Sequence, residues 1–133
     1  MKNFFLGIVA AIAIVGTFAA PQAADAQVPY RSATGSTVSA TAGAATLNAQ
    51  CGVVTSESIT TAAGATYTLT LTNNRVTTGT VAAVNLYNGT NTGGTLSVVS
   101  IAPTANTLTI IVKNTHATTA FNGTIKFSYC VLN

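Results

Sequence analysis

The sequence predicts an all-β protein, a single antiparallel β-sandwich of jelly-roll or immunoglobulin-like type that follows a cleaved N-terminal signal helix. From Cys51 onward, apolar and polar residues alternate with a period of two, the spacing of a strand with one buried face. Asn, Gly and Pro separate these runs about every 10 residues, as turns do between short antiparallel strands. Helical spacing does not occur after the signal segment. These observations define the expected domain, residues 51–133.

Residues 1–26 have the features of a secretory signal peptide. A lysine follows the initiator methionine, and residues 4–20 are apolar and uncharged. Ala24 and Ala26 form a small-x-small site, which predicts cleavage between Ala26 and Gln27. The alternative is a retained membrane anchor, for which the apolar run is a little short. We therefore expect a secreted protein, extracellular or at the cell surface after transit through the periplasm, with no membrane span after cleavage.

Residues 27–50 are rich in Ala, Ser, Thr and Gly and have weak patterning, which is typical of a flexible or extended segment. Val38, Ala40 and Ala42 alternate with polar or small residues, so the segment is also compatible with a strand. Such small side chains would bury little area. The sequence leaves open whether the segment is a disordered leader or a strand donated to a neighbour.

Five alternating runs predict the strands of the sandwich. In the first, four threonines alternate with Tyr67, Leu69 and Leu71, which gives one hydroxyl face and one apolar face. β-Branched residues dominate these runs, as expected for half-buried pleated surfaces. The runs span 66–72, 80–88, 95–102, 107–114 and 124–132. In the last run, the residues expected to face inward are Ile125, Phe127, Tyr129 and Val131.

Turn-forming residues lie between the runs. Asn88-Gly89 and Asn122-Gly123 are expected to form tight turns or bulges, because Asn and Gly tolerate positive φ. Each is followed by a threonine and matches the N-glycosylation sequon, but a turn already accounts for the pattern. The other expected turns are at Ala63-Gly64, Asn73-Asn74, Gly93-Gly94 and Pro103.

Cys51 and Cys130 are the only cysteines, and a disulfide between them is expected in an oxidising compartment. The bridge would tie the start of the domain to its last strand. Closing so long a loop stabilises a fold by on the order of 4 kcal/mol in the chain-entropy model. A metal site at the thiols is disfavoured, because one His and one acid after residue 26 supply too few further ligands. We expect neither a metal nor a cofactor.

After residue 26 the chain is almost free of charge, and Glu57 is its sole acid. Its few bases are scattered, whereas nucleic-acid binding needs a clustered basic face. A weakly charged surface gives little repulsion between copies, which favours a protein that packs against itself. The alternative is a neutral secreted domain that works at low concentration. The basic residues are Arg31, Arg75, Lys113 and Lys126.

The inventory of reactive groups argues against an enzyme. No Asp follows residue 26, so the chain lacks a Ser-His-Asp set. A single carboxylate does not support paired-carboxylate glycoside chemistry or a hard-cation site. His116, the only histidine, lies near Asn114 and Thr118 in a polar loop, where it either shapes a pocket or is simply solvated.

Tyr87 precedes the Asn88-Gly89 turn and is the best exposed candidate for stacking on a sugar, whereas Tyr67 and Tyr129 occupy apolar positions. Trp, which sugar-stacking platforms usually recruit, is absent. Tyr87, Asn88 and His116 are therefore the candidate ligand-loop residues. The threonine rows also fit an ice-binding surface, but threonine is equally a common polar strand former.

The segment from Gly52 to Asn133 contains VVTSESITTAAGATYTLTLTNNRV, YNGTNTGG and VKNTHATTAFNGTIKFSYCVLN. It resembles small β-sandwich modules of predicted phage tail-fibre and virion proteins and of uncharacterised secreted bacterial proteins. The resemblance implies a compact β-domain for assembly or surface recognition, and it carries no defined binding residue. The signal peptide and the cysteine pair depart from the virion setting and imply extracellular use.

The function expected from the sequence is that of a secreted, non-enzymatic structural protein. Such a chain would be a self-associating subunit of an extracellular fibre, pilus-like filament or surface matrix, with the N-terminal segment as a donated strand. The alternative is a recognition module or adhesin that binds a glycan or a cell-surface protein through loops 85–94 and 114–123.

Overall fold

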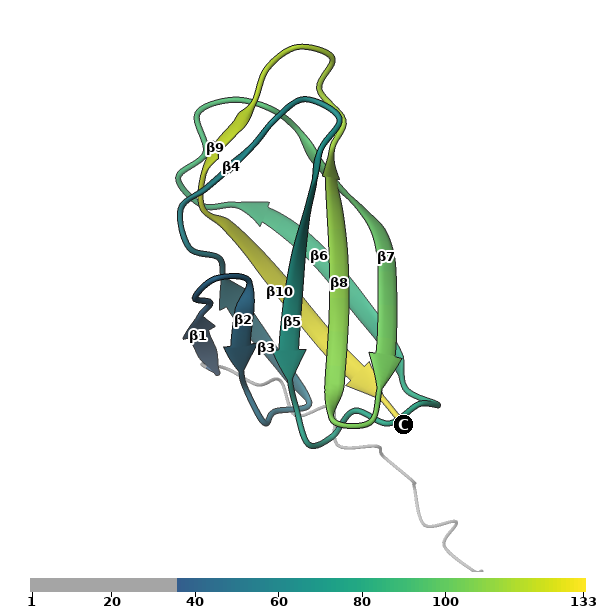
Figure 1. Ribbon diagram of the computed structural model, residues 1–133. Coiled ribbons are helices and arrows are strands. Elements are labelled where there is room, and N and C mark those ends of the chain that lie inside the picture. Colours follow the sequence, from purple (N-terminus) through teal and green to yellow (C-terminus); the bar gives the residue numbers. More distant parts are fainter. Residues whose placement is uncertain (1–35) are drawn as a thin grey trace, which may run out of the picture.

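The computed structural model describes residues 36–133, which form ten strands and no helix (Figure 1). The signal segment, its expected cleavage site at Ala26 and Gln27, and residues 27–35 lie outside the described part of the chain. No helix within 36–133 is long and apolar enough to cross a membrane. The strands are β1 (Thr37–Ser39), β2 (Ala44–Thr46), β3 (Cys51–Thr55), β4 (Ile59–Thr61), β5 (Thr66–Thr72), β6 (Val81–Asn88), β7 (Leu96–Thr104), β8 (Thr107–Asn114), β9 (Phe121–Gly123) and β10 (Ile125–Leu132).

The strands form two four-stranded sheets and one two-stranded sheet. Sheet A has the order β1-β3-β10-β6, sheet B has the order β2-β5-β8-β7, and β4 pairs with β9. Sheets A and B lie one behind the other in Figure 1, and their buried side chains form one core. The rings of Tyr67 on β5 and Phe127 on β10 meet across the layers, with centroids 6.3 Å apart. The expected all-β class is confirmed for the described residues.

Strict alternation predicted the long strands well. β5 and β8 have the predicted bounds, β6, β7 and β10 begin one residue later than predicted, and β7 ends two residues later. Successive strand residues point to opposite faces, so the apolar positions reach the core together. The buried apolar residues of β5, β8 and β10 are Leu69, Leu71, Leu108, Ile110, Val112, Ile125, Phe127, Tyr129 and Val131.

The expectation of a purely antiparallel sandwich is wrong at one side of the molecule. β1 pairs with β3 and β2 pairs with β5, both in parallel, while the other five pairings are antiparallel. The cause is a turn at Ala42 and Gly43, both with positive φ, after which the chain leaves sheet A and joins sheet B. The described part of the N-terminal segment is therefore extended, and Cys51 does not mark the start of the sheets.

Pro103 was expected in a turn but lies inside β7, opposite Leu108. β7 is an edge strand of sheet B. A proline is tolerated there because the N–H that it lacks would point to the free side of the strand, where no neighbouring strand accepts a hydrogen bond. The turn between β7 and β8 comes at Ala105 and Asn106, and Asn106 has a φ of 60°. A β-bulge between Val98 and Ser100 turns Val99 outward, where it is 53% exposed.

Asn122-Gly123 is not a hairpin turn. It ends β9, and the chain passes through Thr124 into β10 of sheet A. Gly123 has a φ of 127°, and a Cβ there would lie 2.8 Å from the carbonyl of Thr90. Glycine is therefore required where this strand changes its partner.

The predicted disulfide between Cys51 and Cys130 is present. It joins β3 to β10 at directly opposite positions, with Cα atoms 4.1 Å apart. β10 also pairs along its full length with β6, so the last strand of the chain is the shared partner of β3 and β6.

Candidate functional site

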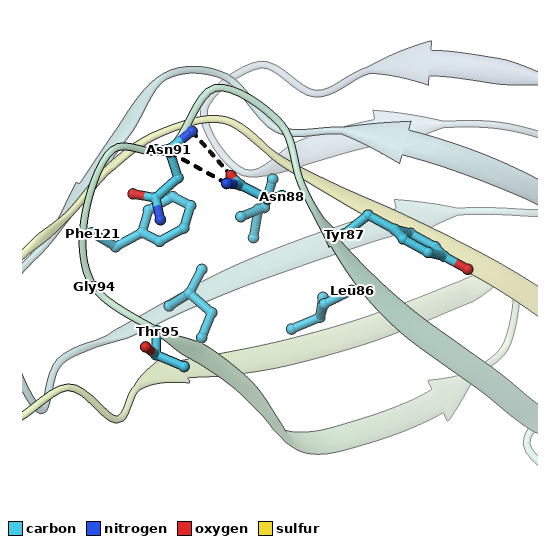
Figure 2. A pocket seen from close by; sticks show the side chains of 9 residues that line it. Leu86, Tyr87, Asn88, Asn91, Gly94, Thr95 and Phe121 are labelled. Carbon is cyan, nitrogen blue, oxygen red and sulfur yellow. Dashed lines mark hydrogen bonds between the residues drawn. The ribbon is translucent and has the colours of Figure 1, made fainter.

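A small hollow lies where β6 ends and the loop 89–95 returns toward β7 (Figure 2). Its volume is about 240 Å³. Apolar side chains form its floor, while amides and a hydroxyl lie near its rim. The lining residues are Leu86, Tyr87, Asn88, Asn91, Gly94, Thr95, Leu96, Phe121 and Ile125.

The amide oxygens of the loop are engaged in holding the loop itself. Asn88 Oδ1 accepts from the Asn91 N–H at 3.0 Å, and Asn88 Nδ2 donates to the Asn91 carbonyl at 3.3 Å. Asn91 Oδ1 accepts from the N–H groups of Gly93 and Asn122 at 3.0 and 3.1 Å. This network explains the Asn-rich sequence of the loop without a ligand.

Tyr87 and Asn88 are neighbours in the chain but do not converge on one ligand position. In Figure 2 the Tyr87 ring points away from the Asn88 and Asn91 side chains. It lies on the outer face of sheet A, 56% exposed, opposite Lys126 of β10. The Tyr87 side chain is thus free for contact with a partner, whereas the Asn88 side chain is hydrogen-bonded to the loop.

His116 is not among the residues that line the hollow. Its Nδ1 accepts from the N–H groups of Thr119 and Thr118 at 2.9 and 3.2 Å, so the imidazole closes its own loop. Of the three candidate ligand residues, Tyr87 and Asn88 therefore both line the hollow but point apart, and His116 lies outside it.

Asn114, named above beside His116 in a polar loop, ends β8 and faces inward. It is fully buried, and its Oδ1 accepts from the N–H groups of Thr95 and His116, both at 3.1 Å. Its Nδ2 donates to the carbonyls of Thr61 and Thr119, both at 2.9 Å. The alternation of the sequence indicated that Asn114 faces inward, since it continues the inward positions Leu108, Ile110 and Val112.

Glu57 has a structural role. Its carboxylate accepts from the Gly43 N–H at 2.9 Å and from the Tyr67 hydroxyl at 3.2 Å, which fixes the turn between β1 and β2. Burial, the negative charge of Glu57 and their hydrogen bond raise the pKa of Tyr67. In the described residues, no group of three or more His, Cys, Asp and Glu side chains is placed to hold a metal ion.

Residues 47–49 are also held to the core. The Tyr129 hydroxyl donates to the Leu47 carbonyl at 3.0 Å, and Asn73 Nδ2 donates to the Ala49 carbonyl at 2.7 Å. Burial raises the pKa of Tyr129 to about 12, although a hydrogen bond from Asn73 lowers it in part. These contacts fix the segment that leads from β2 to β3.

Comparisons with protein-family models, curated proteins and solved structures found no match. The resemblance to virion modules stays a prediction. Of the four large apolar side chains exposed in residues 36–133, three lie on strands β6 and β10 of sheet A, namely Val81, Tyr87 and Leu132.

Proposed function

We propose that the chain is an exported, non-enzymatic structural protein that self-associates into an extracellular fibre, pilus-like filament or surface matrix. In this proposal, sheets A and B are a β-sandwich module of the assembling kind that the sequence resembles. One observation carries the proposal: β1, β2, β6 and β7, the four edge strands of sheets A and B, contain no charged residue. Proteins that keep sheet edges from pairing with other chains commonly place charges there, especially Lys.

The charges of the described residues lie elsewhere. Lys113 is on β8 and Lys126 on β10, and both of these strands have neighbours on either side. Glu57 and Arg75 lie in connections between strands. The charged groups therefore lie on inner strands or in connections, and the edges of sheets A and B carry none that would repel a second chain.

The N-terminal segment offers one route to association. β1 and β2 are three residues long and cover one edge of each sheet. We propose that the same positions on β3 and β5 accept residues 37–46 of a neighbouring copy, which is strand donation. The contact of Glu57 with Gly43 would then be made between copies.

Sedimentation and negative-stain microscopy of the exported, oxidised protein test self-association directly. We expect ordered high-mass assemblies that grow with protein concentration. A protein that stays monomeric at high concentration would contradict the proposal.

Cysteine cross-linking separates donation from an internal strand without deleting any core residue. Ser39 and Thr55 lie opposite each other in β1 and β3. In a Ser39→Cys/Thr55→Cys variant, donation predicts a covalent ladder of multimers on a non-reducing gel. A cross-linked monomer alone would show that β1 stays on its own chain. Ser39→Cys alone is the matched control.

Export is tested by mass spectrometry under non-reducing conditions. We expect a mature chain that begins at Gln27 and contains one internal disulfide. A retained residue 1–26 segment would support the membrane-anchor alternative.

The second candidate function, a recognition module for glycan or a surface protein, is supported by exposed Tyr87 beside the hollow at the end of β6. A glycan array with the wild type and Tyr87→Ala addresses the saccharide version. Binding by the wild type that Tyr87→Ala removes would support it, and no binding by either would exclude it.

A further inference from the structure

β6 has a free main-chain edge along its whole length. Within residues 36–133 its only strand partner is β10, with Ala82 opposite Val131 and Val84 opposite Tyr129. On the other side of β10, the Val131 N–H donates to the Gln50 carbonyl at 2.8 Å. Main-chain groups alternate in direction along a strand, so those of Ala82, Val84 and Leu86 point away from β10. This leaves a row of donors and acceptors facing outward.

The outer face next to this edge carries three exposed large apolar side chains. Val81 is 65% exposed and Tyr87 is 56% exposed, and both lie on β6. Leu132 of β10, opposite Val81, is 54% exposed. Three of the four large apolar side chains that are exposed in the described residues therefore gather on these two strands.

We propose that β6 is the contact between two copies of this chain, paired antiparallel with β6 of a second copy about a two-fold axis at Val84. The inference rests on the proposed self-association and names the surface and register. Val84 lies opposite Val84 of the second copy, and Ala82 lies opposite Leu86. The outward main-chain groups of both strands then bond to each other, and sheet A continues across the junction.

This register is the one that pairs the exposed apolar side chains. It sets Tyr87 opposite Val81 of the second copy, an aromatic and β-branched pair of the kind that stabilises antiparallel sheets. A shift of the pairing by one step in either direction would place Tyr87 opposite Ala83 or Gly79 instead. The self-pairing is symmetric, as a two-fold contact requires.

Charge does not oppose the contact. The nearest charged residue is Lys126, which lies beside Tyr87 on β10. In the proposed register, Lys126 and Tyr87 are aligned with Val81 and Leu132 of the second copy, so the two Lys126 side chains are not opposite each other. The aliphatic part of Lys126 can cover the Tyr87 ring while its ammonium group stays in water.

Amide hydrogen exchange on the exported, oxidised protein tests the edge without any mutation. As concentration rises through the association range, the amides of Ala82, Val84 and Leu86 should exchange at least ~10-fold more slowly, because they gain hydrogen-bond partners. The amide of Leu96 is the internal control. It points outward from β7, since its neighbour Thr95 accepts from Thr115 on the β8 side.

Two double variants test the register. Ala83 and Asn85 are exposed and lie opposite each other across the proposed junction. Ala83→Lys/Asn85→Lys sets like charges opposite and should weaken association at least ~10-fold. Ala83→Glu/Asn85→Lys sets opposite charges there and should restore association. Val99→Lys on the exposed face of β7 is the matched control and should leave association within about twofold of the wild type.

The outcomes are distinct. Protection at Ala82, Val84 and Leu86, with loss and restoration by the two variants, supports the proposal. An assembly in which these amides stay unprotected overturns the β6 contact while self-association stands. Protection with no restoration by the opposite charges overturns the register. A protein that stays monomeric overturns both this contact and the proposed function.

Discussion

The two long edge strands, β6 and β7, contact each other but differ in the features that keep a free edge from pairing with another chain. β7 contains a β-bulge between Val98 and Ser100, and Pro103 removes one N–H donor. β6 runs in unbroken register with β10 and contains neither a bulge nor a proline. Because neither strand carries a charge, the difference lies in the backbone alone. In a chain with so few charged residues, backbone irregularity is the remaining way to protect an edge, and β6 lacks it.

Removing the disulfide should have the largest effect on stability. The bridge lies in sheet A, the sheet that ends in β6. In Cys51→Ala/Cys130→Ala, the unfolded chain is no longer closed between residues 79 apart, so the free energy of unfolding should fall by about 4 kcal/mol. Urea titration measures this loss. Ser128→Ala, between the same strands, should change the stability by less than about 0.5 kcal/mol. A loss below about 1 kcal/mol in the double variant would mean that packing alone holds sheet A.

Asn114→Ala should have the next largest effect, and it acts where β7 begins. The change removes the acceptor of the Thr95 N–H, the donor to the buried carbonyl of Thr61 and the donor to the part-buried carbonyl of Thr119, at a cost of about 3 kcal/mol. Thermal unfolding measures the loss. Exchange of the Thr95 amide should become faster while the amides of β6 that bond to β10 keep their rates. Unchanged protection of Thr95 would contradict this role of Asn114.

Alkaline pH should weaken the core beneath β6. Tyr129 of β10 lies opposite Val84, and burial raises its pKa from 10.0 to about 12. Between these values the unfolded chain loses a proton that the folded chain keeps, so the stability present below pH 10 falls as the pH rises toward 12. Tyr67, whose pKa is also raised, acts in the same direction. Denaturant titrations over this range should show a shallower decline for Tyr129→Phe, and equal slopes would contradict the assignment.

Pro103→Thr should have the smallest effect on stability, within about 0.5 kcal/mol, because position 103 lies on an edge. It nevertheless gives β7 back an N–H donor and makes this edge more like β6. Association measured by sedimentation should increase, with new protection of β7 amides. Ala102→Thr, at the exposed neighbouring position, is the control for side-chain size. Equal association of the two variants would show that the bulge alone guards β7.

The sequence could predict what depends on periodicity. Residues 66–72 and 107–114 alternate so strictly that their bounds and buried faces followed from the pattern. The pattern did not show that Val99 faces outward, because the bulge between Val98 and Ser100 interrupts the alternation. β1, β2, β4 and β9 have three residues each, which is too short for a period to be recognised.

The candidate site could be predicted less well, because it depends on which strands become neighbours. Exposure of Tyr87 followed from its place at a strand end, but the position of His116 outside the hollow that Tyr87 lines did not. Nothing local in β6 indicates that it lies at an edge, since that follows from the pairing of β10 with both β3 and β6. The inward position of Asn114 followed from the alternation of its strand, whereas two of the four groups it joins, on Thr61 and Thr95, come from distant parts of the chain.

The central place of β10 in sheet A has a consequence for the order in which the fold can form. If the chain is exported as proposed, its N-terminus crosses the membrane first, and β3 and β6 would emerge well before the strand that joins them. Until Ile125–Leu132 arrives, β6 has two free edges instead of one, and sheet A cannot be completed. Such late, long-range pairing folds slowly and exposes partly folded chains to one another. Keeping newly exported chains apart during this interval would then be a task for the cell, and chains that lack the last strand should aggregate rather than assemble.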